Sequence, residues 1–147
     1  MKFRFIWVGK TRDENYRNLQ EEYLKRLSHF VKCEIVEVRD SDSPETEGKR
    51  ILEKLNHSSF VCVLDVAGKR LSSHGLAAKV ESWQNARSKE IAFIVGGAEG
   101  LSAEVASKAD FRLSLSLLTF THEMARVVLV EQLYRAYTII RGFPYQK

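Results

Sequence analysis

The sequence predicts an α/β domain with a mainly parallel sheet flanked by helices. Short runs of apolar, β-branched residues alternate along the chain with segments whose apolar residues recur every three or four positions. Two of the runs, 60–65 and 91–95, are almost continuously apolar, as in strands covered on both faces. The 147 residues are 44% hydrophobic and 29% charged, which suits one packed core. We therefore expect residues 1–147 to form a single domain that binds its ligand at the carboxyl ends of the strands.

The first half of the chain alternates twice between strand and helix. The predicted elements are a strand at 3–8, a helix that follows the N-cap Asp13, a strand at 33–38 and a helix within 41–56. The residues expected to face the core from the two helices are Tyr16, Leu19, Tyr23, Leu27, Ile51, Leu52 and Leu55.

The second half contributes three more strands and three more helices. The predicted elements are a strand at 60–65, a helix at 72–86, a strand at 91–95, a short helix from the cap Ser102 to Lys108, a strand at 111–116 and a long helix at 122–140. The residues expected to face the core are Leu76, Val80 and Trp83 in the first of these helices and Met124, Val127, Val128, Leu133 and Tyr137 in the last.

The charge of the chain favours a polyanionic partner. The net charge is +4 and the isoelectric point is near 9.1. Residues 132–147 hold three cations and no acid, interleaved with four aromatic residues. Unpaired RNA bases stack on such rings while phosphates meet Arg or Lys, so this segment is a candidate RNA surface. The alternative is that Tyr134 and Tyr137 form the core face of a helix.

Several other classes of protein are disfavoured. Cys33 and Cys62 lie far apart in apolar runs, which predicts reduced thiols in a cytosolic protein. The chain becomes charged within its first ten residues and has no apolar run near twenty residues, so we expect a cytoplasmic protein without a signal peptide or membrane partner. The four histidines show no ligand spacing, and no metal is expected.

The segment FIVGGAEGLS places Gly96, Gly97 and Gly100 directly after a predicted central strand. Glycines there let a ligand approach the backbone closely. The pattern is not the dinucleotide fingerprint, and no P-loop lysine follows, so we expect a ligand recognised by its adenine and ribose more than by phosphates. A nicotinamide-dependent oxidoreductase is the function suggested by the glycines alone.

Two further strand ends should meet the same edge of the sheet. One is VLDVAGK, where Leu64 and Asp65 end an apolar run, and the other is LSLSLLTFTH, where hydroxyl groups alternate with leucines. Leucine faces with nearby backbone groups suit an adenine ring. Three such loops at one edge favour a cofactor site over three ordinary turns.

In order and separation, FIVGGAEGLS, LSLSLLTFTHEMARVVLVEQLYRAYTIIRG and the terminal PYQK resemble the ribosomal RNA large subunit methyltransferase H family. Members of this family are small SPOUT-class enzymes that methylate N3 of a pseudouridine in helix 69 of 23S rRNA. The resemblance implies a C-terminal trefoil knot, a rare exception to unthreaded chains, with S-adenosylmethionine held by the knot loops. It also implies an assembled ribosome as substrate, a homodimer whose partner's C-terminus helps close the site, and no metal.

The resemblance assigns roles to residues of this chain. The residues implied to contact the cofactor are Leu64, Gly97, Ser116, Leu117, Leu118, Thr119, Phe120 and Thr121, and those implied to shape its slot are Gly96, Gly100 and Leu115. The candidate catalytic or RNA-contacting residues are His122, Arg126, Tyr145, Gln146 and Lys147.

Helix spacing refines some of these candidates. His122 begins the last helix, where it could contact the uracil ring or instead bond the loop backbone. Arg126 follows one turn later and could point into the same cleft. Glu131 and Arg135 have the spacing of a helix ion pair, for which we favour a structural or dimer-interface role.

The C-terminal tail departs from the family pattern. Relatives commonly end in Pro-Tyr-His followed by Arg or Lys, whereas this chain has Gln146 before Lys147. Glutamine cannot titrate near neutral pH, so a base role for that histidine has no counterpart here. Either Gln146 substitutes for a hydrogen-bond donor, or another residue is the base, or activity is altered. The last case leaves open a non-catalytic RNA-binding or ribosome-binding relative with the same fold.

Overall fold

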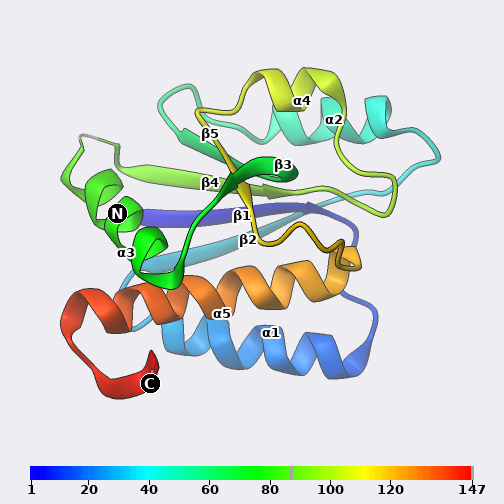
Figure 1. The fold of residues 1–147 in the computed structure, drawn as a ribbon. Coiled ribbons are helices and arrows are strands. Elements are labelled where there is room, and N and C mark those ends of the chain that lie inside the picture. Colours follow the sequence, from blue (N-terminus) through cyan, green and yellow to red (C-terminus); the bar gives the residue numbers. More distant parts are fainter. Residues whose placement is uncertain (87, 147) are drawn as a thin grey trace.

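The computed structural model describes residues 1–86 and 88–146 and contains a five-stranded sheet in the order β2-β1-β4-β3-β5 (Figure 1). The strands are β1 (Lys2–Val8), β2 (Lys32–Val38), β3 (Phe60–Arg70), β4 (Glu90–Val95) and β5 (Phe111–Ser114). The helices are α1 (Glu14–Leu27), α2 (Pro44–Glu53), α3 (Ser73–Asn85), α4 (Ala103–Ser107) and α5 (His122–Arg141), followed by a 3-10 turn, η1 (Pro144–Gln146). All four strand pairs are parallel, which confirms the predicted fold class.

Helices cover both faces of the sheet. Figure 1 shows α1, α3 and α5 on one face and α2 and α4 on the other. Along β1, Phe3, Phe5 and Trp7 pack towards the first group, while Ile6 and Val8 pack towards the second. Because both faces are covered, the central strands are apolar at nearly every position.

Side-chain caps fix where the helices begin. The capping residues that accept hydrogen bonds from first-turn backbone N–H groups are Asp13, Ser43, Ser72, Ser102 and Thr121. The predicted caps Asp13 and Ser102 are confirmed. Each satisfies N–H groups that have no partner within the helix, which explains why short polar residues stand at these positions.

The structure corrects three expectations. Leu19 and Met124 were expected to face the core but are 45% and 37% exposed. Strand β3 does not end at Asp65, because it resumes pairing with β5 at Lys69 after a register shift. The backbone of Gly68 packs so closely there that an added Cβ would lie 2.7 Å from the carbonyl carbon of Arg112.

The C-terminal part of the chain folds back along α5. Tyr137 is buried and its ring stacks on that of Phe30, with centroids 5.4 Å apart, so for this residue the core interpretation is correct. Tyr134 is partly buried and contacts Tyr145 edge-on, with ring centroids 4.8 Å apart. Within the described residues, no helix has the length and apolar character needed to cross a membrane.

Candidate functional site

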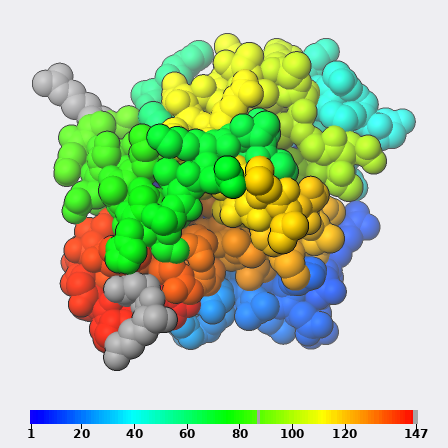
Figure 2. All heavy atoms as spheres, viewed as in Figure 1, coloured from blue at the N-terminus to red at the C-terminus, as the bar shows by residue number. Residues whose placement is uncertain are grey.

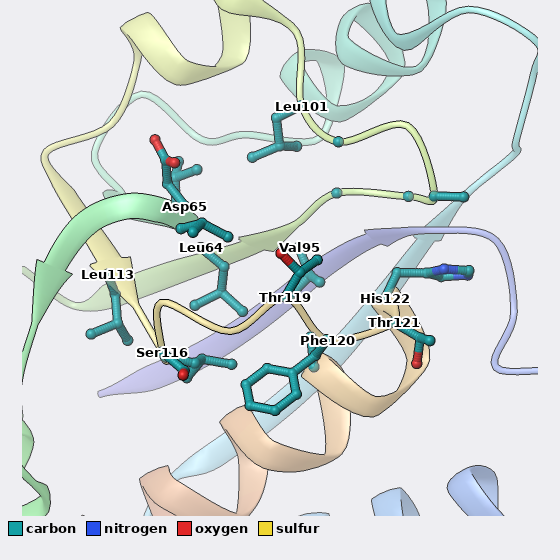
Figure 3. Close-up of a pocket in the computed structure, with 18 of the residues that line it drawn as sticks. Leu64, Asp65, Val95, Leu101, Leu113, Ser116, Thr119, Phe120, Thr121 and His122 are labelled. Atoms are coloured by element: carbon teal, nitrogen blue, oxygen red, sulfur yellow. The ribbon is translucent and has the colours of Figure 1, made fainter.

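A cavity of about 550 Å³ lies at the carboxyl ends of β3, β4 and β5. Figure 3 shows the turn after β4 and Leu101 on one side, with the segment from Ser116 to His122 facing them. Leu64, from the end of the regular part of β3, points between these walls. The volume is in the range of sites for small molecules and cofactors.

The glycine turn forms the first wall. The N–H of Gly100 donates to the carbonyl of Gly97 at 3.0 Å, and Gly100 has a φ of +83°, which favours glycine. An added Cβ on Gly96 would lie 2.9 Å from the carbonyl carbon of Gly100. The turn is therefore closed tightly on itself, and its backbone borders the cavity.

The second wall is the loop between β5 and α5. The N–H of Leu118 donates to Oγ of Ser116 at 3.0 Å, and the hydroxyl of Ser114 donates to the carbonyl of Ser116 at 3.0 Å. Thr121 caps α5, so the N-terminus of a 20-residue helix lies at the cavity. The partial positive charge at a helix N-terminus favours an anionic ligand group.

The structure brings together most of the residues that the sequence singled out. Those that line the cavity are Leu64, Gly96, Gly97, Gly100, Leu115, Ser116, Leu118, Thr119, Phe120, Thr121 and His122. Leu117 is not among them and is 64% exposed. Asp65, expected at this edge as the end of an apolar run, also lines the cavity. The lining residues that sequence reasoning did not assign are Val63, Val66, Val95, Ala98, Leu101, Ala106, Leu113 and Ala125. The ends of the apolar runs were the signal for several of them.

Two side chains with acid–base groups line the cavity among the described residues, Asp65 and His122. They belong to different walls, β3 and the start of α5. Nε2 of His122 lies 4.0 Å from Oε2 of Glu123. The remaining lining is dominated by aliphatic side chains and glycine backbone, so polar recognition depends on few groups.

Arg126 does not point into this cavity, contrary to the expectation from helix spacing. Its side chain is fully buried, and its Cζ lies 4.8 Å from the centre of the Trp7 ring. Its Nη2 donates to the carbonyl of Val8 at 2.6 Å, and its Nη1 donates to Oγ1 of Thr11 at 2.9 Å. Burial lowers its pKa to about 10. Arg126 therefore fastens α5 to the end of β1.

Glu123 makes a second connection between α5 and the loop after β1. Its Oε1 accepts the backbone N–H groups of Arg12 and Asp13 at 3.1 and 3.0 Å. Burial opposes ionisation of this carboxyl, but the two backbone hydrogen bonds and the electrostatic attraction of His122 and Arg126 together outweigh it, so its pKa is lowered. The first turn of α5, which carries His122, is thus held from two sides.

The tail follows the far end of α5 and folds back onto the middle of this helix. The hydroxyl of Tyr145 donates to Oε1 of Glu131 at 2.9 Å, and Arg135 pairs with the same carboxylate. Glu131 lies nine residues beyond His122, so about 14 Å of helix separates this cluster from the start of α5 at the cavity. The structure does not bring Tyr145 to the cavity of its own chain, while the side chain of Gln146 and all of Lys147 lie outside the described residues.

Apolar side chains are exposed near the mouth of the cavity. Val66, Leu117 and Leu118 are 47%, 64% and 75% exposed. Figure 2 shows that the surfaces of β3 and of the loop after β5 adjoin on one face of the molecule. Exposed aliphatic residues grouped beside a cavity favour coverage by another molecule.

In the part of the chain that the structure describes, no group of three or more His, Cys, Asp or Glu side chains could hold a metal ion. The two thiols are also poorly placed for chemistry. Burial raises the pKa of Cys33 to about 12 and raises that of the buried Cys62 as well. Neither sulfur is a reactive thiolate near neutral pH.

Comparisons with known proteins agree on one family. The family described as "Predicted SPOUT methyltransferase" matches residues 1–146. Proteins named ribosomal RNA large subunit methyltransferase H from Desulfotalea psychrophila and Carboxydothermus hydrogenoformans are 44% and 40% identical to this chain, and in both comparisons all of each chain is covered. A solved structure of "a probable methylase family protein" from Haemophilus influenzae has a TM-score of 0.59 at 14% identity, covering 99% of this chain and 70% of that one. This last likeness concerns the fold alone.

Proposed function

The chain belongs to the SPOUT methyltransferase family, among the ribosomal RNA large subunit methyltransferases H, and we propose that it methylates 23S rRNA with S-adenosylmethionine as the donor. The target that the family resemblance implies is N3 of a pseudouridine in helix 69, on the assembled ribosome. The observation that carries the proposal is the cavity in which ten of the eleven predicted cofactor residues meet.

The cavity fits the proposed cofactor. Its volume of about 550 Å³ suits a nucleoside with an amino-acid arm. Leu64 and Leu115 offer apolar faces for adenine, and the backbone of the glycine turn offers donors and acceptors for the ring edge. The N-terminus of α5 suits the carboxylate of the amino-acid arm.

Bound S-adenosylmethionine supplies an electrophilic methyl group on a sulfonium. The protein's own contribution is alignment, since an in-line displacement is accelerated when both reactants are held in position. We assign to His122 the contact with the uracil ring, as acceptor of its N3 proton or as hydrogen-bond partner. Arg126 and Glu123 hold the helix turn that carries His122, so their role is positioning.

A second copy of the chain is part of the proposal. Tyr145 does not line the cavity of its own chain, and its hydroxyl is bonded to Glu131, about 14 Å along α5 from His122, so we assign a tail that serves the reaction to a partner. The exposed Val66, Leu117 and Leu118 support coverage of the cavity mouth by that partner. We also propose that residues 1–147 form a single domain with a trefoil knot. The support is that the glycine turn and the loop after β5 line the same cavity.

The experiment is transfer of labelled methyl from S-adenosylmethionine to assembled ribosomes. We expect transfer by the wild type, and a fall of at least about 100-fold in kcat for His122→Asn with the cofactor Kd within about threefold. Absence of transfer together with absence of cofactor binding at millimolar ligand would refute the proposal.

Gln146 favours one alternative, a relative that binds RNA or the ribosome without catalysis. This alternative predicts normal cofactor affinity, no transfer by the wild type and no recovery in Gln146→His. If Gln146→His transfers methyl while the wild type does not, glutamine has removed a required tail group. If both transfer, the tail histidine of relatives is dispensable in this chain.

A further inference from the structure

We propose that Asp65 recognises the ribose of the cofactor by accepting hydrogen bonds from its two hydroxyl groups. This inference rests on the proposed function, because it assumes an adenosine-containing ligand in the cavity.

A break in strand pairing places Asp65 at the cavity wall. The register between β3 and β5 shifts between Leu64 and Lys69, which takes the intervening residues out of the ladder. Oδ1 of Asp65 accepts the backbone N–H of Ala67 at 2.9 Å, and this bond fixes the start of the bulge. Asp65 therefore lines the cavity (Figure 3), on a segment that does not pair with β5.

The carboxylate has acceptor capacity left for a ligand. An ionised carboxylate offers about four acceptor positions, and the bond from Ala67 uses one. Oδ2 lies 3.6 Å from Nη1 of Arg112, which is beyond hydrogen-bond distance. The side chain is 29% exposed, so it keeps contact with solvent until a ligand covers it.

The position along β3 favours ribose over the other donor groups of the cofactor. Asp65 directly follows Leu64, which we place against adenine, and ribose is the group bonded to adenine. A carboxylate after a parallel strand binds ribose hydroxyls in the same way in dinucleotide folds. The amino-acid arm carries a carboxylate, which Asp65 repels and the N-terminus of α5 attracts, so this arm belongs at the other wall.

The test is calorimetric binding of two ligands to the full-length wild type and to Asp65→Asn. The ligands are S-adenosylhomocysteine and 5′-methylthioadenosine. The second ligand keeps the ribose but lacks the amino-acid arm. Asparagine retains Oδ1 as acceptor for Ala67, so the bulge is preserved. We expect both ligands to bind Asp65→Asn about tenfold more weakly.

Glu99→Gln is the matched control. Glu99 is exposed in the glycine turn and does not line the cavity, so this variant makes the same change in charge without touching the ribose position. We expect both ligands to bind it as tightly as the wild type. An equal loss in Glu99→Gln and Asp65→Asn would overturn the inference, because it would reflect net charge alone.

A change in the ligand tests the same contact without a variant. We expect 2′,3′-dideoxy-5′-methylthioadenosine to bind the wild type about tenfold more weakly than 5′-methylthioadenosine and to lose nothing further in Asp65→Asn. Unchanged binding of both parent ligands by Asp65→Asn would overturn the inference and leave the proposed function standing. If Asp65→Asn binds S-adenosylhomocysteine more weakly but binds 5′-methylthioadenosine as tightly as the wild type, the inference is overturned. Asp65 would then contact the ammonium group of the amino-acid arm, and not the ribose. A wild type that binds no adenosine ligand would refute the proposed function as well.

Discussion

Gly96 and Gly97 are neighbours in the cavity wall, yet the structure predicts opposite responses to alanine. At Gly96 an added Cβ would lie 2.9 and 3.0 Å from the carbonyl carbon and oxygen of Gly100 and 3.0 Å from Cγ of Leu101. Two of these are backbone atoms, so the turn itself must move. At Gly97 the nearest atom is Cβ of Val8 at 3.4 Å, an ordinary contact.

The expected difference follows from these distances. Overpacking of this kind costs about 1–3 kcal/mol, so we expect Gly96→Ala to lower the free energy of unfolding by about 2 kcal/mol and Tm by roughly 4–8 °C. Gly97→Ala should stay within about 0.5 kcal/mol of the wild type. The loss of unfolded-chain entropy that alanine brings is the same in both variants and cancels in the comparison.

Two assays check this pair. Denaturant unfolding gives the free energies, and calorimetry with S-adenosylhomocysteine gives the affinities. We expect the displaced turn in Gly96→Ala to raise Kd about tenfold or more, while Gly97→Ala, whose Cβ points towards Val8, keeps Kd within about threefold. Equal stabilities and equal affinities of the two variants would refute the account of a turn closed on itself.

Three further predictions concern the helix end, a pH dependence and the thiols. Gly142 ends α5 with a φ of +73°, so Gly142→Ala should lower the free energy of unfolding by about 1 kcal/mol and Gly142→Asn by less, as urea titration will show. The folded-state pKa of Glu123 is lowered, so its stabilisation is fully present above the unfolded-state pKa of about 4.3 and is lost as pH falls through the folded-state value. The stability difference between wild type and Glu123→Gln, about 1 kcal/mol at pH 7, should therefore shrink below pH 4.3, and a difference that grows there would contradict this reasoning. Because burial raises the pKa of both thiols, Cys33 and Cys62 should react with iodoacetamide at pH 7.5 far more slowly than in the unfolded chain. Mass spectrometry measures the labelling, and rapid labelling of the folded protein would contradict the raised pKa values.

The fold could be predicted from the sequence where local signals decide it. The capping residues Asp13 and Ser102 predict where two helices begin, and continuous apolar runs predict the central strands β3 and β4. Helical periodicity predicted burial less well for residues at the edge of a helix's apolar face. Leu19 and Met124 have the correct spacing but stay exposed, because spacing defines a stripe and not how far the neighbouring elements cover it.

The candidate site was predictable in outline for the same reason. The glycines, Leu64 and the loop from Ser116 lie at ends of parallel strands, and such ends meet at one edge of a sheet. The extension of β3 depends on a second stretch of pairing with β5, which no local pattern encodes. Arg126 lies one helical turn after His122, but its side chain is buried in the core. There it donates to the carbonyl of Val8, which is more than a hundred residues earlier in the chain.

The measurement that tests the central claim most directly is to map the methyl group after labelling assembled ribosomes with S-adenosylmethionine and the wild-type protein. Digestion of the 23S rRNA and mass spectrometry of the fragments identify the modified nucleotide. We predict a single added methyl on a pseudouridine of helix 69, at N3. Label on a different nucleotide would contradict the proposed target, and the absence of label, in a protein that binds the cofactor, would contradict catalysis itself.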